Sequence, residues 1–183
     1  LPIFLEEEKI NNLLDDIKFE SGFKGQRDKL IIELFYLTGM RLSELINIKI
    51  KDLNFNNFEV KVIGKRKKER IIPLSDKIIK SIKMIIDNKN PEDYLFTNTK
   101  GDKLYNKMVY RVVIKYIGKV SSMKKKSPHI LRHTFATHML NNGADINAIK
   151  ELLGHSNLSA TQVYTHNTIE KLKKIYHQSH PRA

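Results

Sequence analysis

The segment from Ser127 to Leu140, which reads SPHILRHTFATHML, constrains the fold more than any other part of the sequence. Ser127 can accept hydrogen bonds from a first helical turn and Pro128 has the φ angle of the first helical position, so the segment predicts a helix beginning here. On this helix His129 and Arg132 are three residues apart and share a face, while the apolar residues supply a buried surface. Because a helix N-terminus favours anions, the pair is typical of a phosphate site. A surface helix with two solvated polar side chains is the alternative.

Composition limits the chemistry open to such a site. The chain has 183 residues and no cysteine, which excludes a thiolate nucleophile and Cys-ligated zinc. Its formal net charge of +13 and pI near 9.8 favour a polyanionic partner. No long apolar run is present, so nucleic acid is favoured over acidic lipid or a membrane, and we expect a cytoplasmic protein. Because the first residue is Leu1 rather than Met, we expect a fragment of a longer chain.

Apolar spacing predicts a mainly helical chain. Gly39 and Gly154 are placed where glycine ends helices, and Ser75 and Asp145 are expected to cap the helices that follow them. The helix over residues 103–120 has basic residues on its outer face, and either lies over DNA or faces water. The other helices are expected over residues 1–19, 26–39, 41–49, 75–88, 146–153 and 168–177.

Residues 58–75, FEVKVIGKRKKERIIPLS, change to a period of two and predict a β-hairpin. The turn either reaches along a phosphate backbone or is only solvated. It carries one carboxylate, Glu69, against Lys65, Arg66, Lys67, Lys68 and Arg70.

Two further candidates stand at helix ends. Arg41 lies at the junction of two predicted helices, where its backbone is held rigidly; alternatively it only pairs with Glu44 one turn on. His155 directly follows the glycine that ends a helix, so it either emerges at a site or only interacts with the helix dipole. Tyr164 lies nine residues beyond His155. Positive charge also precedes the His129 and Arg132 face, at Lys124, Lys125 and Lys126.

Together these residue types match the needs of phosphodiester transfer. Two arginines can bind the equatorial oxygens bidentately, a lysine can protonate the leaving oxygen, and an imidazole can accept a proton from tyrosine. The candidates are Arg41, Lys65, His129, Arg132, His155 and Tyr164.

A metal-dependent nuclease needs clustered carboxylates instead. Glu44, Glu69 and Glu151 lie in different segments, so the sequence predicts neither a metal nor another cofactor.

Six segments, in order, carry a resemblance that covers nearly the whole chain: LPIFLEEE, TGMRLSEL, VIGKRKKERIIPL, HILRHTFATHML, LLGHSN and VYTH. They resemble the catalytic domain of the tyrosine recombinases, the phage-integrase family, and look most like bacterial Xer-type recombinases and mobile-element integrases. The resemblance implies an α+β, mainly helical fold with a small antiparallel hairpin or sheet, and one catalytic domain over residues 1–183. The family's N-terminal DNA-clamping domain has no counterpart here, so we expect weak DNA binding.

The resemblance also implies an activity: a site-specific recombinase that cleaves and rejoins DNA without a metal. Tyr164 would be the nucleophile that forms a 3′-phosphotyrosine, and Arg41, Arg132 and His155 would hold the phosphate. Lys65 would be the general acid, with His129 assisting as acid or base. Backbone contacts are expected from Arg66, Lys67, Lys68, Lys124, Lys125 and Lys126. Three further histidines, which match no catalytic position, are expected to be structural: His133, His138 and His166.

Other expectations concern partners and alternatives. The family commonly has a glycine after the lysine, where this chain has Arg66, so the turn lacks that freedom at positive φ. In the family, the C-terminal helix docks on a neighbouring protomer in a tetrameric synapse on double-stranded DNA. The resemblance implies the same for residues 168–177 of this chain, and it implies that the free protein is a monomer. The alternative is that this helix folds back on its own domain. Two other functions are alternatives to recombination: relaxation of DNA strands, as by a type IB topoisomerase, and DNA binding without catalysis.

Overall fold

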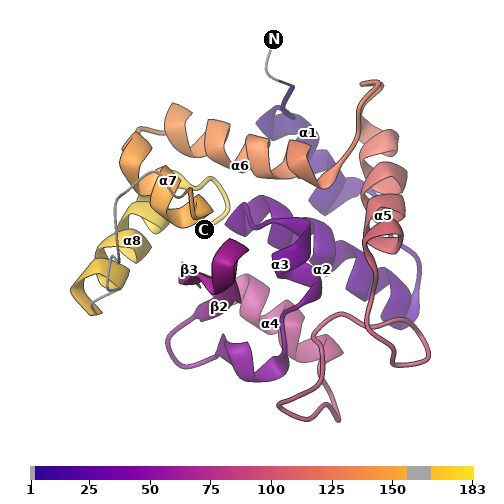
Figure 1. Cartoon of the computed structure of the whole chain (residues 1–183). Helices are drawn as coiled ribbons and strands as arrows, with labels where there is room; N and C mark the ends of the chain where they lie inside the picture. Colours follow the sequence, from indigo (N-terminus) through magenta and orange to yellow (C-terminus); the bar gives the residue numbers. More distant parts are fainter. Residues whose placement is uncertain (1–2, 156–165) are drawn as a thin grey trace.

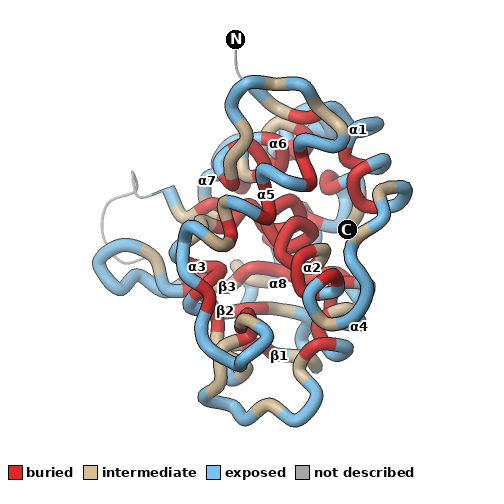
Figure 2. The backbone as a smooth tube through the Cα atoms, turned by 90° about the vertical axis from the view of Figure 1, so that its right-hand side faces the viewer, coloured by how far each residue is buried: buried red, intermediate tan, exposed pale blue. Residues whose placement is uncertain are grey.

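The computed structural model describes residues 3–155 and 166–183 of the chain. The described part is mainly helical with one three-stranded antiparallel sheet, which confirms the expected fold class. Its centre is α2 (Gly22–Thr38), whose second half is buried on every side (Figure 2). Apart from Glu33 and Thr38 this half is apolar all round, and a helix of that kind lies inside a protein, so the other elements surround it.

The remaining helices pack around α2. In Figure 1, α7 (Ile146–Leu153) and α8 (His166–Ser179) lie on one side of the molecule, α5 (Asn106–Val120) lies on the other, and α6 (Pro128–Asn141) runs across the upper part between them. The smaller pieces are α1 (Glu7–Asn11) with a π-helical continuation η1 (Asn12–Asp16), α3 (Leu42–Ile46), a 3-10 turn η2 (Ile50–Asp52) and α4 (Asp76–Ile85). No helix within the described residues is long and apolar enough to cross a bilayer.

Local signals set most helix ends. Ser75 Oγ accepts from the Ile78 N–H at the start of α4, and Asp145 Oδ1 accepts from the Asn147 N–H at 2.8 Å at the start of α7. Both caps were predicted. Ser127 is the N-cap residue of α6, but its side chain makes no capping hydrogen bond, so that expectation was wrong.

Gly39 ends α2 in the left-handed conformation, with φ 62°, as its position predicted. A Cβ atom there would lie 2.6 Å from side-chain atoms of both Phe135 and Leu153. Glycine therefore allows the end of α2 to approach α6 and α7 closely. Gly154 ends α7 in the same way, with φ 70°.

The sheet is built from β1 (Leu53–Asn54), β2 (Glu59–Ile63) and β3 (Glu69–Pro73), in that order. The predicted hairpin is the β2–β3 pair, closed by a hydrogen bond from the Gly64 N–H to the Lys68 carbonyl at 2.8 Å. The turn between them, η3 (Lys65–Lys67), places Arg66 at φ 58° and Lys67 at φ 57°. Two side-chain-bearing residues thus occupy the left-handed region, which costs about 1–2 kcal/mol each.

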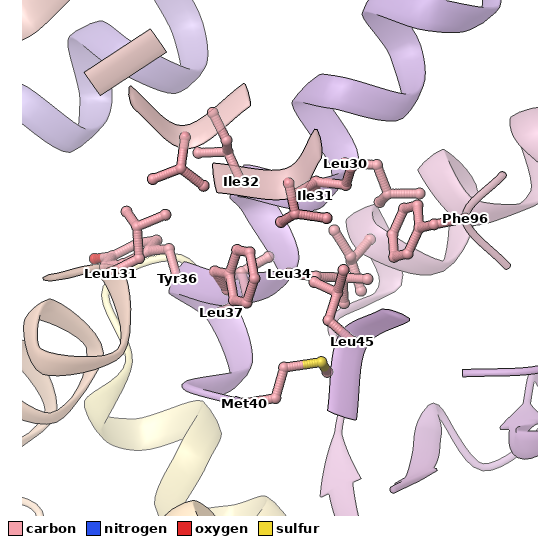
Figure 3. Packing of buried hydrophobic residues seen from close by; sticks show 14 of the residues in the cluster. Leu30, Ile31, Ile32, Leu34, Tyr36, Leu37, Met40, Leu45, Phe96 and Leu131 are labelled. Carbon is pink, nitrogen blue, oxygen red and sulfur yellow. The ribbon is translucent and has the colours of Figure 1, made fainter. Parts of the chain in front are cut away.

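Two apolar clusters form the core. The larger one surrounds α2 and is shown in Figure 3, where Leu34 of α2 lies close to Leu45 of α3. The second joins α6, α7 and α8 through Phe135, Leu152 and the fully buried Tyr176, among others.

The C-terminal helix folds back onto its own domain in this single chain. Leu172 and Tyr176 of α8 are buried in the second cluster, and Asn142 Nδ2 donates to the Ser179 carbonyl at 3.0 Å. Beyond the helix, Arg182 forms an ion pair with Asp15 at 2.8 Å. The structure thus has the cis arrangement, which was the alternative to docking on a neighbour.

Two histidines are part of the core. His138 Nδ1 lies 2.9 Å from the Tyr36 hydroxyl, consistent with the structural role predicted for it. His180, which the sequence did not single out, accepts from the Arg182 N–H at Nδ1, so Nε2 carries the hydrogen that faces the Tyr36 carbonyl at 3.1 Å. Burial lowers the pKa of His180 to about 4, so its imidazole is neutral at pH 7.

Acid should destabilise the protein through His180. The unfolded side chain takes up a proton near pH 6.5, whereas the folded one does so only near pH 4, so this contribution to stability is lost as pH falls between those values. We expect the unfolding free energy of the wild type, relative to His180→Gln, to fall by about 3 kcal/mol from pH 7 to pH 4. Denaturant titrations at several pH values measure it; a difference independent of pH would contradict it.

The strained turn makes a second prediction. Arg66→Gly should unfold at higher denaturant concentration than Arg66→Ala, because only glycine relieves the cost of the left-handed backbone. We expect a gap of about 1 kcal/mol between the two variants. Both remove the same charge, so equal stability would show that the turn is unstrained.

Candidate active site

Arg41 is held at the junction that the sequence predicted. Its backbone N–H donates to Glu44 Oε2 at 2.7 Å, and its guanidinium donates to Glu44 Oε1 at 3.1 Å and to the Gly154 carbonyl at 3.5 Å. The pairing with Glu44 is therefore present. About a quarter of the side chain, 28%, is exposed, so the same guanidinium also faces solvent.

Arg132 projects from α6 between the ends of two other helices. One Nη donates to the Gly39 carbonyl at 2.5 Å, and the other donates to the Leu153 carbonyl at 2.9 Å. Burial, together with the charges of Arg41 and Arg70, lowers the pKa of Arg132 to about 10. The group stays charged at pH 7, and an anion beside it would relieve the repulsion that lowers its pKa.

His155 follows the end of α7, as predicted, and is exposed. Partial burial lowers the pKa of its imidazole, and the charges of Arg132 and Arg41 lower it further. A neutral imidazole beside two guanidinium groups can accept a proton or a hydrogen bond. The helix dipole alone would raise the pKa of this histidine, whereas burial first and the neighbouring arginines second lower it.

Lys65 comes to the site from the β2–β3 turn. It lines a cavity of about 340 Å³ together with Arg41, and the walls also include Gly64, Arg66, Lys68, Arg70 and Gly154. The structure thus brings the predicted general acid and one predicted phosphate-binding arginine to the same opening.

The other predicted residues lie as follows. His129 is exposed in the first turn of α6, one turn before Arg132, and Tyr164 lies outside the described residues. Of the lysines before α6, Lys124 and Lys125 are exposed, whereas Lys126 donates to the carbonyl of Met123.

The basic residues of the hairpin turn and the histidines expected to be structural differ in how exposed they are. Arg66, Lys67 and Lys68 are exposed on the hairpin turn, so they are free to contact a phosphate backbone. His133 and His166 are exposed as well, so only His138 of the three histidines expected to be structural is built into the core.

Sequence reasoning missed the role of Arg70, which it placed in the basic turn. Arg70 is buried: its two Nη atoms donate to the two carboxylate oxygens of Glu44, and Nε donates to the Leu152 carbonyl at 3.0 Å. The available signal was the strand period, because Arg70 lies on the same inward face of β3 as Ile72. Burial would raise the pKa of Glu44, but hydrogen bonds and charge from Arg70, with help from Arg41, lower it.

Three arginines therefore converge on one helix end. Arg70, Arg132 and Arg41 donate to the successive carbonyls of Leu152, Leu153 and Gly154. These carbonyls are the negative end of α7, which stabilises cations.

The converging arginines leave positive charge unmatched. Among the described residues, Glu44 pairs with Arg41 and Arg70, and Arg132 donates to carbonyl groups only, so three positive charges meet one negative charge. The arrangement suits a phosphate. No group of three or more His, Cys, Asp or Glu in the described part of the chain can hold a metal ion.

Comparison with known proteins gives a consistent result. The chain is 45% identical over 188 aligned residues to tyrosine recombinase XerC of Staphylococcus epidermidis, and 41% identical to tyrosine recombinase XerD of Staphylococcus saprophyticus. These alignments cover 100% of this chain but 63% and 64% of the relatives, so the chain spans less than two thirds of their length.

Solved structures show the same likeness. The crystal structure of XerA recombinase matches with a TM-score of 0.73 at 30% identity, over 100% of this chain and 65% of that one. XerH site-specific recombinase bound to its difH substrate in a pre-cleavage complex matches with a TM-score of 0.73 at 28% identity, over 96% and 55%. The model of the phage integrase family matches residues 4–171. The chain therefore belongs to the phage integrase family.

Proposed function

We propose that this protein is a tyrosine site-specific recombinase that breaks and rejoins double-stranded DNA. The observation that supports this most directly is the cluster of Arg41, Arg70 and Arg132 at the end of α7, whose unmatched positive charge opens beside Lys65. A phosphodiester in this opening would gain stabilisation as negative charge develops on its oxygens in the transition state. The relatives named as recombinases, and the XerH complex with its DNA substrate, support the same activity.

Each predicted site residue has a step in this reaction. The Tyr164 oxygen forms a bond to phosphorus while the bond from phosphorus to the 5′ oxygen breaks, which leaves a 3′-phosphotyrosine. Tyrosine has a pKa of about 10, so its proton must pass to a base, and the imidazole of His129 suits that role, while His155 helps Arg41 and Arg132 to hold the phosphate. Lys65 gives a proton to the departing 5′ oxygen. Reversal with another 5′ hydroxyl rejoins the strand.

The assembly on DNA is part of the proposal. We infer that this chain corresponds to the catalytic domain and works in a multi-protomer synapse, with α8 exchanged between neighbours. The cis packing of Leu172 and Tyr176 would then have to be given up when the synapse forms. A recombinase requires two paired target sites, whereas an enzyme that only relaxes DNA does not. A covalent adduct between protein and DNA distinguishes either enzyme from a protein that only binds DNA.

The nucleophile assignment predicts a clean separation of function. Tyr164→Phe should abolish the covalent adduct with a nicked suicide duplex and leave duplex affinity near the wild-type value, because only the attacking oxygen is lost. Denaturing gel electrophoresis detects the adduct. Adduct formation that requires magnesium, or that persists in the variant, would reject the mechanism; the wild type should work in excess chelator and without ATP.

The arginine assignment predicts unequal effects on cleavage and binding. Arg41→Lys and Arg132→Lys keep the charge but lose the bidentate geometry, so cleavage should fall roughly a hundredfold, whereas duplex affinity should change far less. Single-turnover rates and titrations on the same duplex give the two values. Equal losses would indicate arginines that only clamp the DNA backbone.

A further inference from the structure

Arg70 and Arg41 compete for one buried carboxylate. Arg70 binds both oxygens of Glu44, with its second Nη at 2.9 Å from Oε2. The Arg41 side chain has a single contact with the carboxylate, at 3.1 Å from Oε1. The carboxylate is therefore mostly satisfied by Arg70, which is buried like Glu44 itself, whereas Arg41 is part exposed at the cavity.

The order of these contacts has a physical consequence. A buried carboxylate without a paired cation costs free energy, so it is expected to pair with the nearest other cation. The most favourable pair is a bidentate one with an arginine. Without Arg70, the nearest cation to Glu44 is Arg41, already within 3.1 Å. Arg41 would then turn its guanidinium into the protein and away from the opening.

Arg70 also fixes the second acceptor of Arg41. Its Nε donates to the Leu152 carbonyl at 3.0 Å, and a Cβ placed on Gly154 would lie 3.0 Å from Arg70 Cδ. The Arg70 side chain thus packs against the residue whose carbonyl accepts from Arg41. Arg70 therefore holds in place both acceptors of the Arg41 guanidinium, which are the Glu44 carboxylate and the Gly154 carbonyl.

We propose that Arg70 is a positioning residue that occupies Glu44 and so keeps Arg41 available to a phosphate in the cavity. This inference rests on the proposed function for the identity of that phosphate. Arg70 also lines the cavity, but its guanidinium nitrogens already donate to Glu44 and to the Leu152 carbonyl, so its effect on a phosphate passes through Arg41.

The first test uses inorganic phosphate, which needs neither Tyr164 nor a target DNA. Phosphate should raise the melting temperature of the wild type above its value in chloride of equal ionic strength, because it binds the folded state. Arg70→Gln should lose most of this rise, as Arg41→Gln should, and Glu44→Gln combined with Arg70→Gln should regain it because the competing charge is gone. A full rise in Arg70→Gln, or no recovery in the double variant, overturns the proposal even if no DNA is cleaved.

The second test measures cleavage of duplexes with either a normal phosphate or a neutral methylphosphonate at the scissile position. Cleavage at an uncharged methylphosphonate depends less on a nearby cation than cleavage at a phosphate does. Arg70→Gln should therefore lower the cleavage rate roughly a hundredfold on the phosphate duplex and by at least about tenfold less on the methylphosphonate duplex. Arg41→Gln should show the same difference between the two duplexes. A defect of equal size on both substrates indicates a merely structural role and overturns the proposal.

Arg27→Gln is the matched control. Arg27 is as buried as Arg70, pairs with Asp28 at 2.7 Å and donates to the Thr97 carbonyl, but it lies away from the cavity. Its variant should be destabilised and yet show the wild-type rate ratio on the two substrates and the wild-type response to phosphate. Tyr164→Phe is run in parallel: an adduct in that variant rejects the proposed function, while the phosphate experiment still decides the role of Arg70.

Discussion

The buried carboxylate of Glu44 is the charge on which the arrangement of the site depends. Two charges of the same sign within a few ångströms repel strongly where water is scarce, and here three guanidinium groups share one helix end. Glu44 and the carbonyl groups at the end of α7 make that grouping tolerable. They do not neutralise it, because the charges of Arg41 and Arg70 still add to the effect of burial in lowering the pKa of Arg132. The protein thus keeps a site whose electrostatics improve when an anion arrives.

The three imidazoles of His138, His155 and His180 show how one residue type is used differently according to its surroundings. His138 and His180 lie inside the core, contact Tyr36 and have pKa values lowered chiefly by burial. His155 is exposed, and the positive charges of Arg132 and Arg41 add to the lowering of its pKa. His138 and His180, in their neutral form, are part of the packed core. The third is available to a substrate.

Features that depend on near neighbours in the chain were predictable. Gly39 and Gly154 end helices because they tolerate a left-handed backbone, and Ser75 and Asp145 cap helices because their oxygens reach the next turn. The positions of Arg41, Arg132 and His155 followed from those boundaries together with the family resemblance. Ser127 has the same local signal as Ser75 but makes no capping bond, and α6 still begins at Pro128, whose φ angle suits the first helical position.

Features that depend on distant contacts were not predictable in the same way. The turn residues Lys65 to Lys68 and Arg70 look alike in sequence, but only Arg70 faces inward, where it meets Glu44, 26 residues away. The position of α8 depends on the pocket that Tyr176 fills, which α6 and α7 create only when folded. Amphipathic spacing predicted that this helix buries a face, and it carried no information on which chain supplies the partner surface.

Gly39 shows how closely folding and chemistry are joined in this domain. Its backbone is left-handed, its missing Cβ leaves room for Phe135 and Leu153, and its carbonyl accepts from Arg132. Any other residue here would strain the backbone and push α6 and α7 apart in the same event. A side chain at this position would thus be disfavoured for two separate reasons, and a stabilising change elsewhere in the chain would not restore the carbonyl position that Arg132 uses. For this residue, improving the fold and improving the arginine site are not independent engineering problems.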